Sequence, residues 1–301
     1  MNIALTGATG FLGRYITRRL AKAGHRLRCW HRPDSDLTGF GEAEKSIDWV
    51  IGSLEAPRAF GDFCCKTDAV IHCALFRPAG LGFRAAGQQA FDEFVRVNLL
   101  GTLSLFQAAR EYNVPRFIFI STCAVHEVIL SDRKLDENHP TRARNHYGAH
   151  KAALEQFVHS FGFGDQWPIC ALRPSGIYGM AHPPKRSRWY DIIQTVKSGR
   201  PFNSDAGGKE VHAADVARAT ELLLSADPQA VQGQAFNCCD MYVSERHVAE
   251  IARELSGSRS EIGGANAGPK NQIDTGRIRS LGMTFGGESL LRSTIGELLN
   301  G

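Results

Sequence analysis

A glycine-rich turn near the start of the chain constrains its fold more than any other feature. The segment Thr6–Gly13 (TGATGFLG) joins an apolar run, Asn2–Leu5, to a helical pattern over Arg14–Ala23. Glycines with the spacing G-x-x-G-x-x-G allow a tight turn, a close approach of the backbone to a pyrophosphate, and close packing of helix on strand. The first turn of the helix then offers unpaired N–H groups to phosphates. The turn therefore predicts a dinucleotide-binding site.

Apolar runs and helical patterns alternate through the first two-thirds of the 301 residues, as they do in βαβ units. The runs are continuous, which suits strands covered on both faces of a parallel sheet. The sequence therefore predicts an α/β fold with a doubly wound parallel sheet. The predicted strands are Asn2–Leu5, Arg26–Trp30, Ala69–Cys73, Phe117–Ile120, Ile169–Leu172 and Ala235–Cys238, and the predicted helices between them are Arg14–Ala23, Gln88–Tyr112 and Tyr147–Phe161.

This alternation stops after Arg173-Pro174. The helical pattern over Ala214–Ala226 returns to the sheet, whereas three others do not: Tyr190–Ser198, Ser244–Leu255 and Ser289–Leu299. We predict a dinucleotide-binding domain of residues 1–174 plus 208–240. A small discontinuous substrate-binding lobe, residues 175–207 plus 241–301, is expected over the carboxyl edge of the sheet, where open α/β sheets bind ligands.

The net charge of +4 is small and spread along the chain, so it gives no support to nucleic-acid binding, which needs a clustered basic face. Lys185, Arg186 and Arg188 form one dense basic run, which favours a solvated loop over a site for an acidic substrate. No apolar stretch approaches the roughly 18 residues of a membrane span, and no signal peptide precedes the first strand. We therefore expect a cytoplasmic protein with a small-molecule substrate and neither a nucleic-acid nor a membrane partner.

Eight cysteines occur without a Cys-x-x-Cys spacing. Several of them, such as Cys73 and Cys170, lie in apolar runs, where cysteine behaves as a small hydrophobic residue. A zinc site and a disulfide framework are both disfavoured, so no metal is predicted.

Tyr147 and Lys151 are four residues apart, so on a helix they lie on one face and can form a proton-transfer pair. A free tyrosine has a pKa of about 10, which makes it a poor base at neutral pH. A neighbouring cation favours the phenolate and lowers that pKa by roughly 1–3 units. We therefore expect Lys151 to lower the pKa of Tyr147 and to prepare it for general acid or base catalysis.

The end of the second predicted strand indicates which dinucleotide is used. An acidic residue there would bind the ribose hydroxyls of NAD, whereas an arginine would accept the additional phosphate of NADP. The chain has Cys29-Trp30-His31-Arg32, without an acid, so Arg32, with help from Arg14, favours NADP. Asp34 and Asp36 are close enough in sequence to keep NAD as an alternative.

Together these motifs resemble the extended short-chain dehydrogenases/reductases, the NAD-dependent epimerase/dehydratase family. The resemblance runs nearly end to end and implies a Rossmann fold with a C-terminal substrate lobe. The shared motifs are Thr6–Gly13, Val70–Ala74 (VIHCA), Asn98 with Gly101-Thr102, Ser121-Thr122, Tyr147 with Lys151, Arg173-Pro174, Ile177–Gly179, His212 with Asp215–Ala217, and Asp274, Arg277 and Leu281-Gly282.

The resemblance assigns roles to individual residues. It makes Tyr147 the acid/base, Lys151 its partner and a ligand of the nicotinamide ribose, and Thr122 the hydroxyl that binds the substrate oxygen. The implied cofactor contacts are Gly7, Thr9, Gly10, Phe11, Leu12, Gly13, Arg14, Arg32, Ser53, Leu54, Cys73, Ala74, Leu75, Asn98, Ser121, Tyr147, Lys151, Pro174 and Ile177. The implied substrate contacts are Phe76, Thr122, Cys123, Ala124, His126, Tyr147, Ser175, Gly176 and Tyr178.

Four further residues have supporting roles by this resemblance. Asn98 is a structural or relay residue in its helix, and His72 supports a strand end. His212 is expected, with Asp215, to pack and cap the returning helix. For His126, substrate contact and local packing are equally favoured. A homodimer through a helical interface is a family expectation.

Departures from the family pattern narrow the chemistry. Sugar-nucleotide dehydratases carry Asp-Glu directly after the catalytic Thr, where this chain has Cys123 and Ala124, so dehydration is disfavoured. Many nucleotide-sugar enzymes have Asn at the position of Gly176 and an Arg before the His212 segment, where only Lys209 offers a cation here. This weakens the case for a nucleotide-sugar substrate. The segments 76–90 and 178–191 are expected to set specificity.

The leading hypothesis is an NAD(P)-dependent reductase or dehydrogenase, in which a hydride passes between nicotinamide and a carbonyl or alcohol carbon of a sugar-like or other small substrate. The alternative is an epimerase that retains its NAD through the cycle. A third hypothesis, a dinucleotide-binding sensor on the same fold, would not need Thr122, Tyr147 and Lys151 together.

Overall fold

A seven-stranded, wholly parallel sheet forms the centre of the computed structural model, which describes residues 1–265, 268 and 271–300. The strand order is β3-β2-β1-β4-β5-β6-β10, so the doubly wound sheet predicted from the sequence is confirmed. The direction of winding reverses between β1 and β4, where such sheets bind ligands. The strands are β1 (Asn2–Thr6), β2 (Arg26–His31), β3 (Ile47–Ile51), β4 (Ala69–His72), β5 (Phe117–Ile120), β6 (Ile169–Pro174) and β10 (Ala235–Cys238).

All six predicted strands are present with ends that differ by at most two residues, but β3 was not predicted. β3 pairs only with β2 and forms one edge of the sheet, and its residues are half-buried or exposed. A strand that is covered on one side lacks the continuous apolar run by which the central strands are recognised.

Apolar side chains alternate between the two faces of the sheet, so each face packs against its own helices. Ile118 faces α1 (Phe11–Lys22) and α8 (Ala213–Ser225). Phe119 faces the opposite layer, which contains α2 (Phe60–Cys64), α5 (Gly101–Glu111) and α6 (His146–His159). Because the strands are all parallel, their carboxyl ends lie together at one edge of the sheet.

The predicted single helix over Gln88–Tyr112 is wrong. It is divided into α3 (Phe83–Gln89), α4 (Phe91–Phe94), a π-helical turn (Val95–Leu100) and α5. The break after α3 lies at Ala90, whose backbone (φ −131°, ψ 50°) is not helical. π-helical turns are frequent at functional sites, and this one carries Asn98.

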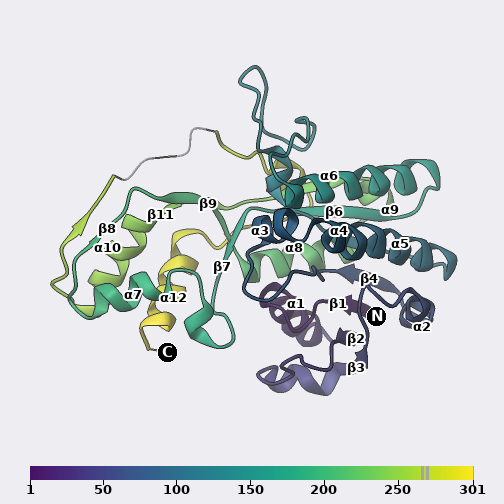
Figure 1. The fold of residues 1–301 in the computed structure, drawn as a ribbon, viewed down its shortest axis with the longest axis horizontal. Helices are drawn as coiled ribbons and strands as arrows, with labels where there is room; N and C mark the ends of the chain where they lie inside the picture. The colour runs from purple at the N-terminus through teal and green to yellow at the C-terminus, as the bar shows by residue number, and fades with distance from the viewer. Residues whose placement is uncertain (266–267, 269–270, 301) are drawn as a thin grey trace.

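A second group of elements lies beside the carboxyl edge of the sheet, at the left of Figure 1. It contains a three-stranded sheet in the order β11-β9-β7 and a short β12-β8 pair. Its own apolar core includes Tyr178, Trp189 and Ile295. Its elements are β7 (Gly176–Tyr178), α7 (Tyr190–Lys197), β8 (Phe202–Asn203), β9 (Gly207–His212), β11 (Met241–Ser244), α10 (Glu245–Ser256), β12 (Ile262–Gly263) and α12 (Gly287–Asn300), while α9 (Pro228–Val231) and α11 (Gly276–Ser280) lie outside this core.

The proposed boundary between 207 and 208 falls inside β9, so one strand belongs to both parts of the predicted division. Residues 266–267, 269–270 and 301 of the predicted lobe lie outside the described residues. No helix in the described part of the chain is both long and apolar enough to cross a membrane.

Three buried histidines make the stability of the fold depend on pH. Burial lowers the pKa of His150 from its ordinary 6.5 to about 3, and the pKa values of His126 and His212 to about 4. The folded protein therefore keeps them neutral, while the unfolded chain binds protons below pH 6.5. Because the unfolded state gains protons, stability is lost as pH falls from 6.5 towards 4, by about 1.4 kcal/mol per histidine at pH 5.5.

His212→Asn should isolate one of these contributions. His212 accepts a hydrogen bond from the Ala214 N–H at the start of α8, a role that asparagine also fills well. Urea unfolding at pH 7.5 and 5.5 measures how much the free energy of unfolding falls between these two pH values. This fall should be smaller by about 1.4 kcal/mol in the variant than in the wild type. The exposed His146→Asn is the control, and an equal loss in all three proteins would contradict the prediction.

Candidate active site

The glycine-rich turn has the geometry that a dinucleotide requires. Gly7 has a φ of +74°, and a Cβ there would lie 2.7 Å from the backbone nitrogen of Ala74, beyond the end of β4. A Cβ on Gly13 would overlap the Gly7 carbonyl. The N-cap of α1 is Gly10, whose lack of a side chain leaves the first N–H groups of the helix open. This cradle at the reversal point of the sheet fits a pyrophosphate.

Two buried residues shape the backbone next to this turn. His72 hydrogen bonds to the Thr6 hydroxyl (2.7 Å) and the Thr102 hydroxyl (2.9 Å), so it supports the strand ends as predicted. The Asn98 side chain accepts from the Phe76 N–H (2.7 Å) and donates to the Phe76 carbonyl (2.9 Å). Both ends of the amide are used to hold the Phe76 backbone, which supports the structural role of Asn98, and its contact with the cofactor stays a prediction.

Thr122, Tyr147 and Lys151 meet at the carboxyl edge of the sheet. Thr122 lies two residues beyond β5, and its hydroxyl accepts a hydrogen bond from the Ala124 N–H (3.1 Å). Tyr147 and Lys151 lie on the first turns of α6, whose N-cap, Asn145, accepts from the Gly148 N–H (2.9 Å). A side-chain hydrogen bond links Tyr147 to Thr122. The hydroxyl–phenol pair and the lysine therefore converge as the sequence predicted.

The expected lowering of the Tyr147 pKa is wrong for this structure. Burial raises the pKa of Tyr147, and the hydrogen bond with Thr122 offsets only part of that effect. The Lys151 ammonium donates to the Ile120 carbonyl (2.7 Å) and lies 4.4 Å from the centre of the Phe119 ring. Burial also lowers the pKa of Lys151 to about 8. At neutral pH Tyr147 is therefore a phenol, ready to give a proton.

A buried ionic network accounts for two other predicted site residues. Arg173 and Glu155, at most 2% exposed, pair through a 2.6 Å contact beneath the strand ends. Ser121 donates to the Glu155 carboxylate, and His126 binds the Arg173 guanidinium (3.1 Å). Both side chains are thus engaged in the network, which for His126 favours the packing alternative, while the cofactor contact of Ser121 stays a prediction.

The Arg14 side chain, which was expected to help in binding NADP, is engaged by the protein itself. Its guanidinium is buried and donates to the backbone carbonyls of Thr9, Asp36 and Thr38. Arg14 thus holds the loop after β2. Arg32 remains available, since its side chain is 59% exposed and has a 3.4 Å contact with the exposed Asp34.

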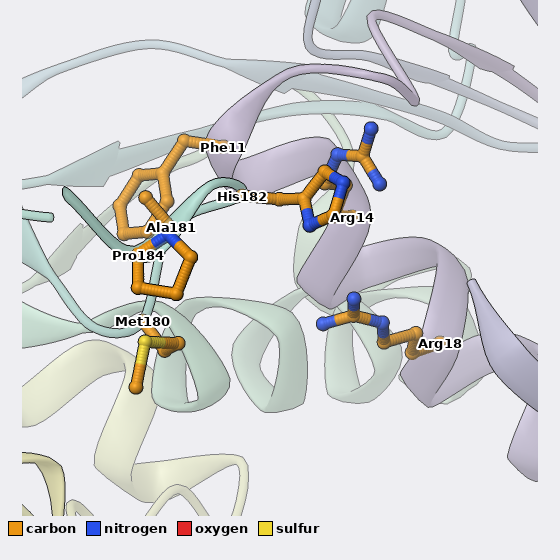
Figure 2. A pocket seen from close by; sticks show the side chains of 7 residues that line it. All are labelled: Phe11, Arg14, Arg18, Met180, Ala181, His182 and Pro184. Carbon is orange, nitrogen blue, oxygen red and sulfur yellow. The ribbon is translucent and has the colours of Figure 1, made fainter. Parts of the chain in front are cut away.

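Figure 2 shows a small pocket of about 150 Å³ between the start of α1 and the segment after β7. Phe11, Arg14 and Arg18 line one side, and Met180, Ala181, His182 and Pro184 line the other. His182 lies 3.3 Å from the Asp36 carboxylate, which Arg14 also contacts at 3.7 Å. The lobe segment therefore touches the loop after β2.

Tyr178 was predicted to contact the substrate, but it does not lie where a substrate could reach it. Its ring is wholly buried in the core of the lobe, between Trp189 (5.2 Å) and His212 (5.0 Å). The Cys123 thiol donates to the Arg173 carbonyl (3.0 Å), and burial raises its pKa, so it is a neutral thiol. Gly176 lies directly opposite Glu210 in the β7–β9 pair.

The site also contains residues that were not predicted. Phe83, on α3, stacks on the Tyr147 ring at 5.5 Å, although Phe83 is half exposed. Glu210 is buried and pairs with Arg188 at 2.6 Å. Phe83 lies in the segment 76–90, which was expected from the sequence to set specificity. Glu210 could not be identified from the residues around it, because only the pairing of β7 with β9 brings it to Gly176.

The other predicted contacts are distributed around the same edge. Ser53 caps a turn through the Glu55 N–H (3.2 Å), and Leu54 is buried against α5. Cys73 is a neutral thiol because burial raises its pKa to about 11. Pro174 ends β6 and Ile177 is half-buried in β7. Within the described residues, no group of three His, Cys, Asp or Glu side chains could hold a metal ion.

Comparison with known proteins identifies relatives of this architecture. The family model described as "NAD dependent epimerase/dehydratase family" matches residues 3–239. The mouse dTDP-D-glucose 4,6-dehydratase is 31% identical over 84% of the chain and 71% of that protein. The human and bovine proteins of that name are matched over only 52% and 51% of their lengths.

Two other relatives bear on the chemistry and the fold. A farnesyl-quinoline-oxide ketoreductase from Stigmatella aurantiaca is 27% identical over 87% of the chain and 75% of that protein. The UDP-glucose 4-epimerase of Thermotoga maritima superposes with a TM-score of 0.81 over 100% of this chain and 98% of that one, at 18% identity. At that identity the superposition shows the fold alone.

Proposed function

Because this chain belongs to the NAD-dependent epimerase/dehydratase family, we propose that it is an NAD(P)-dependent reductase or dehydrogenase. The substrate is a sugar-like or other small molecule with a carbonyl or alcohol group. The observation that carries the proposal is the convergence of Thr122, Tyr147 and Lys151 at the carboxyl edge of the sheet. The bound nicotinamide supplies or accepts the hydride, and the side chains manage the proton and the oxygen.

In the reducing direction Tyr147 donates its phenolic proton to the substrate oxygen as negative charge develops there. Tyr147 holds this proton at neutral pH, since burial keeps its pKa above the ordinary value of 10. The Thr122 hydroxyl accepts from the Ala124 N–H and is hydrogen bonded to Tyr147, so a substrate oxygen that takes the place of this mutual bond would receive both hydrogens. Two donors aimed at one oxygen stabilise the charge of the transition state. Lys151 keeps further N–H groups for the ribose of the cofactor.

Dehydration is disfavoured despite the name of the mouse relative. Elimination of water needs an additional acid and base, and the residues after Thr122 are a neutral buried thiol, Cys123, and Ala124. The ketoreductase relative supports the reductase instead. The decisive assay follows NADPH absorbance over a panel of carbonyl compounds. Change in a sugar without net change of the cofactor would favour an epimerase, and binding without turnover would favour a sensor.

We propose NADP as the preferred cofactor, with Arg32 as the ligand of its additional phosphate. Arg32→Ala should weaken NADPH binding by about 10- to 100-fold, because a hydrogen bond to a charged group contributes about 1.5–3 kcal/mol. NADH binding should stay nearly the same. Fluorescence titration measures both affinities. Arg26→Ala, at the amino end of β2, the strand that Arg32 follows, is the matched control, and equal weakening of NADH binding would contradict the proposal.

Two less specific expectations complete the proposal. The protein is a homodimer that pairs through helices, and it acts in the cytoplasm. Sedimentation equilibrium measures the first expectation directly, and a monomer at micromolar concentration would overturn it.

A further inference from the structure

The side chain of Glu210 occupies space that two glycines leave open. Glu210 lies in β9, directly opposite Gly176 of β7 and two residues from Gly208, so the three share one face of the small sheet. A Cβ on Gly176 would lie 2.8 Å from the Glu210 carboxyl carbon, and one on Gly208 would lie 2.5 Å from its Oε1. The carboxylate therefore lies flat over both glycines.

One oxygen of this carboxylate has a partner and the other has none. The Arg188 guanidinium contacts Oε1 at 2.6 Å, while Glu210 itself is 1% exposed. Among the described residues, no group hydrogen bonds to Oε2. A buried acceptor without a partner costs about 1–3 kcal/mol or more when it is charged. Because the Arg188 side chain is 42% exposed, a ligand can approach the pair from its side.

The Glu210–Arg188 pair lies at the edge that carries the reacting groups. Gly176 follows the end of β6 by two residues, and the preceding Arg173 carbonyl accepts from Cys123, the neighbour of Thr122. The Asp240 N–H donates to the Glu210 carbonyl (2.9 Å) and the Ser175 N–H donates to the Cys238 carbonyl (3.0 Å), so β9 is tied to the ends of β6 and β10. The pair therefore lies on the lobe side of these strand ends, and we place the far end of a substrate that reaches Tyr147 against it.

The geometry points to Glu210 and Arg188 as a hydroxyl-binding pair that selects an uncharged, hydroxylated substrate and excludes a phosphorylated one. This inference rests on the proposed function. A hydroxyl group both donates and accepts, so it donates to Oε2 of Glu210 and accepts from Arg188. A phosphate has no hydrogen to give to Oε2 when fully ionised, and ionised Glu210 cancels the charge of Arg188 that would attract it. Burial raises the pKa of Glu210 to about 7, so the comparison belongs above that pH.

The test uses one carbon skeleton with and without phosphate: dihydroxyacetone and dihydroxyacetone phosphate. Calorimetry measures the binding of each to the protein loaded with NADP. The wild type should bind dihydroxyacetone at least about tenfold more tightly than its phosphate. Glu210→Gln, which leaves Arg188 uncompensated, should shift this ratio at least about tenfold towards the phosphate. Arg188→Gln, at a half-exposed position, should weaken dihydroxyacetone binding without loss of the fold.

Glu250→Gln is the matched control, since it removes a carboxylate from the Arg246–Glu250 pair on α10 and should leave the ratio unchanged. Tighter binding of the phosphate by the wild type, an unchanged ratio in Glu210→Gln, or no binding of either compound to the wild type would each overturn the inference. Binding needs no turnover, so an inactive enzyme with the expected ratio would reject the proposed function alone.

Discussion

Replacement of Tyr147 by phenylalanine is expected to lower kcat by about 10²–10⁴-fold, the usual contribution of a positioned general acid. The substitution removes the proton that the buried phenol holds at neutral pH, but keeps the ring that stacks on Phe83. Affinity for NADPH should therefore change little. Steady-state kinetics and fluorescence titration separate the two effects.

The matched control is Tyr112→Phe. Tyr112 is 48% exposed and follows α5, so loss of its hydroxyl should leave kcat unchanged. A Tyr147→Phe enzyme that retains more than about a tenth of kcat would show that another group donates the proton.

The second large effect concerns stability. Glu155→Ala should lower the free energy of unfolding by about 3–5 kcal/mol, because it leaves the buried Arg173 charge without compensation. The carboxylate also accepts from Ser121, which adds a second unpaired group. Urea-induced unfolding at pH 7.5 measures the loss.

Glu254→Ala removes the same kind of side chain from the exposed contact with Arg292 and should cost at most about 1 kcal/mol. An equal loss of unfolding free energy in the two variants would show that the charges of the Arg173–Glu155 pair add little to stability beyond the packing of their side chains. Since Ser121 precedes Thr122, the Glu155 variant should also show a reduced kcat.

The sheet could be predicted because its central strands are covered on both faces, and such strands consist of continuous apolar runs. The edge strand β3 and the division between α3 and α5 could not be predicted. Both depend on neighbouring elements, which leave β3 partly exposed and the chain bent after α3. The small strands β7, β9 and β11 are also defined by pairing between distant segments.

The candidate site divides in the same way. Thr122, Tyr147 and Lys151 were predicted because a strand end and a four-residue helical spacing are local features. The internal partners of Ser121, His126 and Arg14 could not be predicted because they lie far along the chain: Ser121 binds Glu155 and Arg14 binds Thr38. Local sequence identifies which side chains can do chemistry, but not which of them packing has already engaged.

The continuity of β9 has a mechanical consequence. This strand starts among elements of the lobe and ends at α8, which packs against α1 beneath the main sheet. The ladder that joins β9 to β7 and β11 ties three short connections to the main sheet side by side, so a swing of the lobe would have to bend all three at once. Displacement of the half-exposed Phe83, which stacks on the Tyr147 ring, is a smaller movement beside the site.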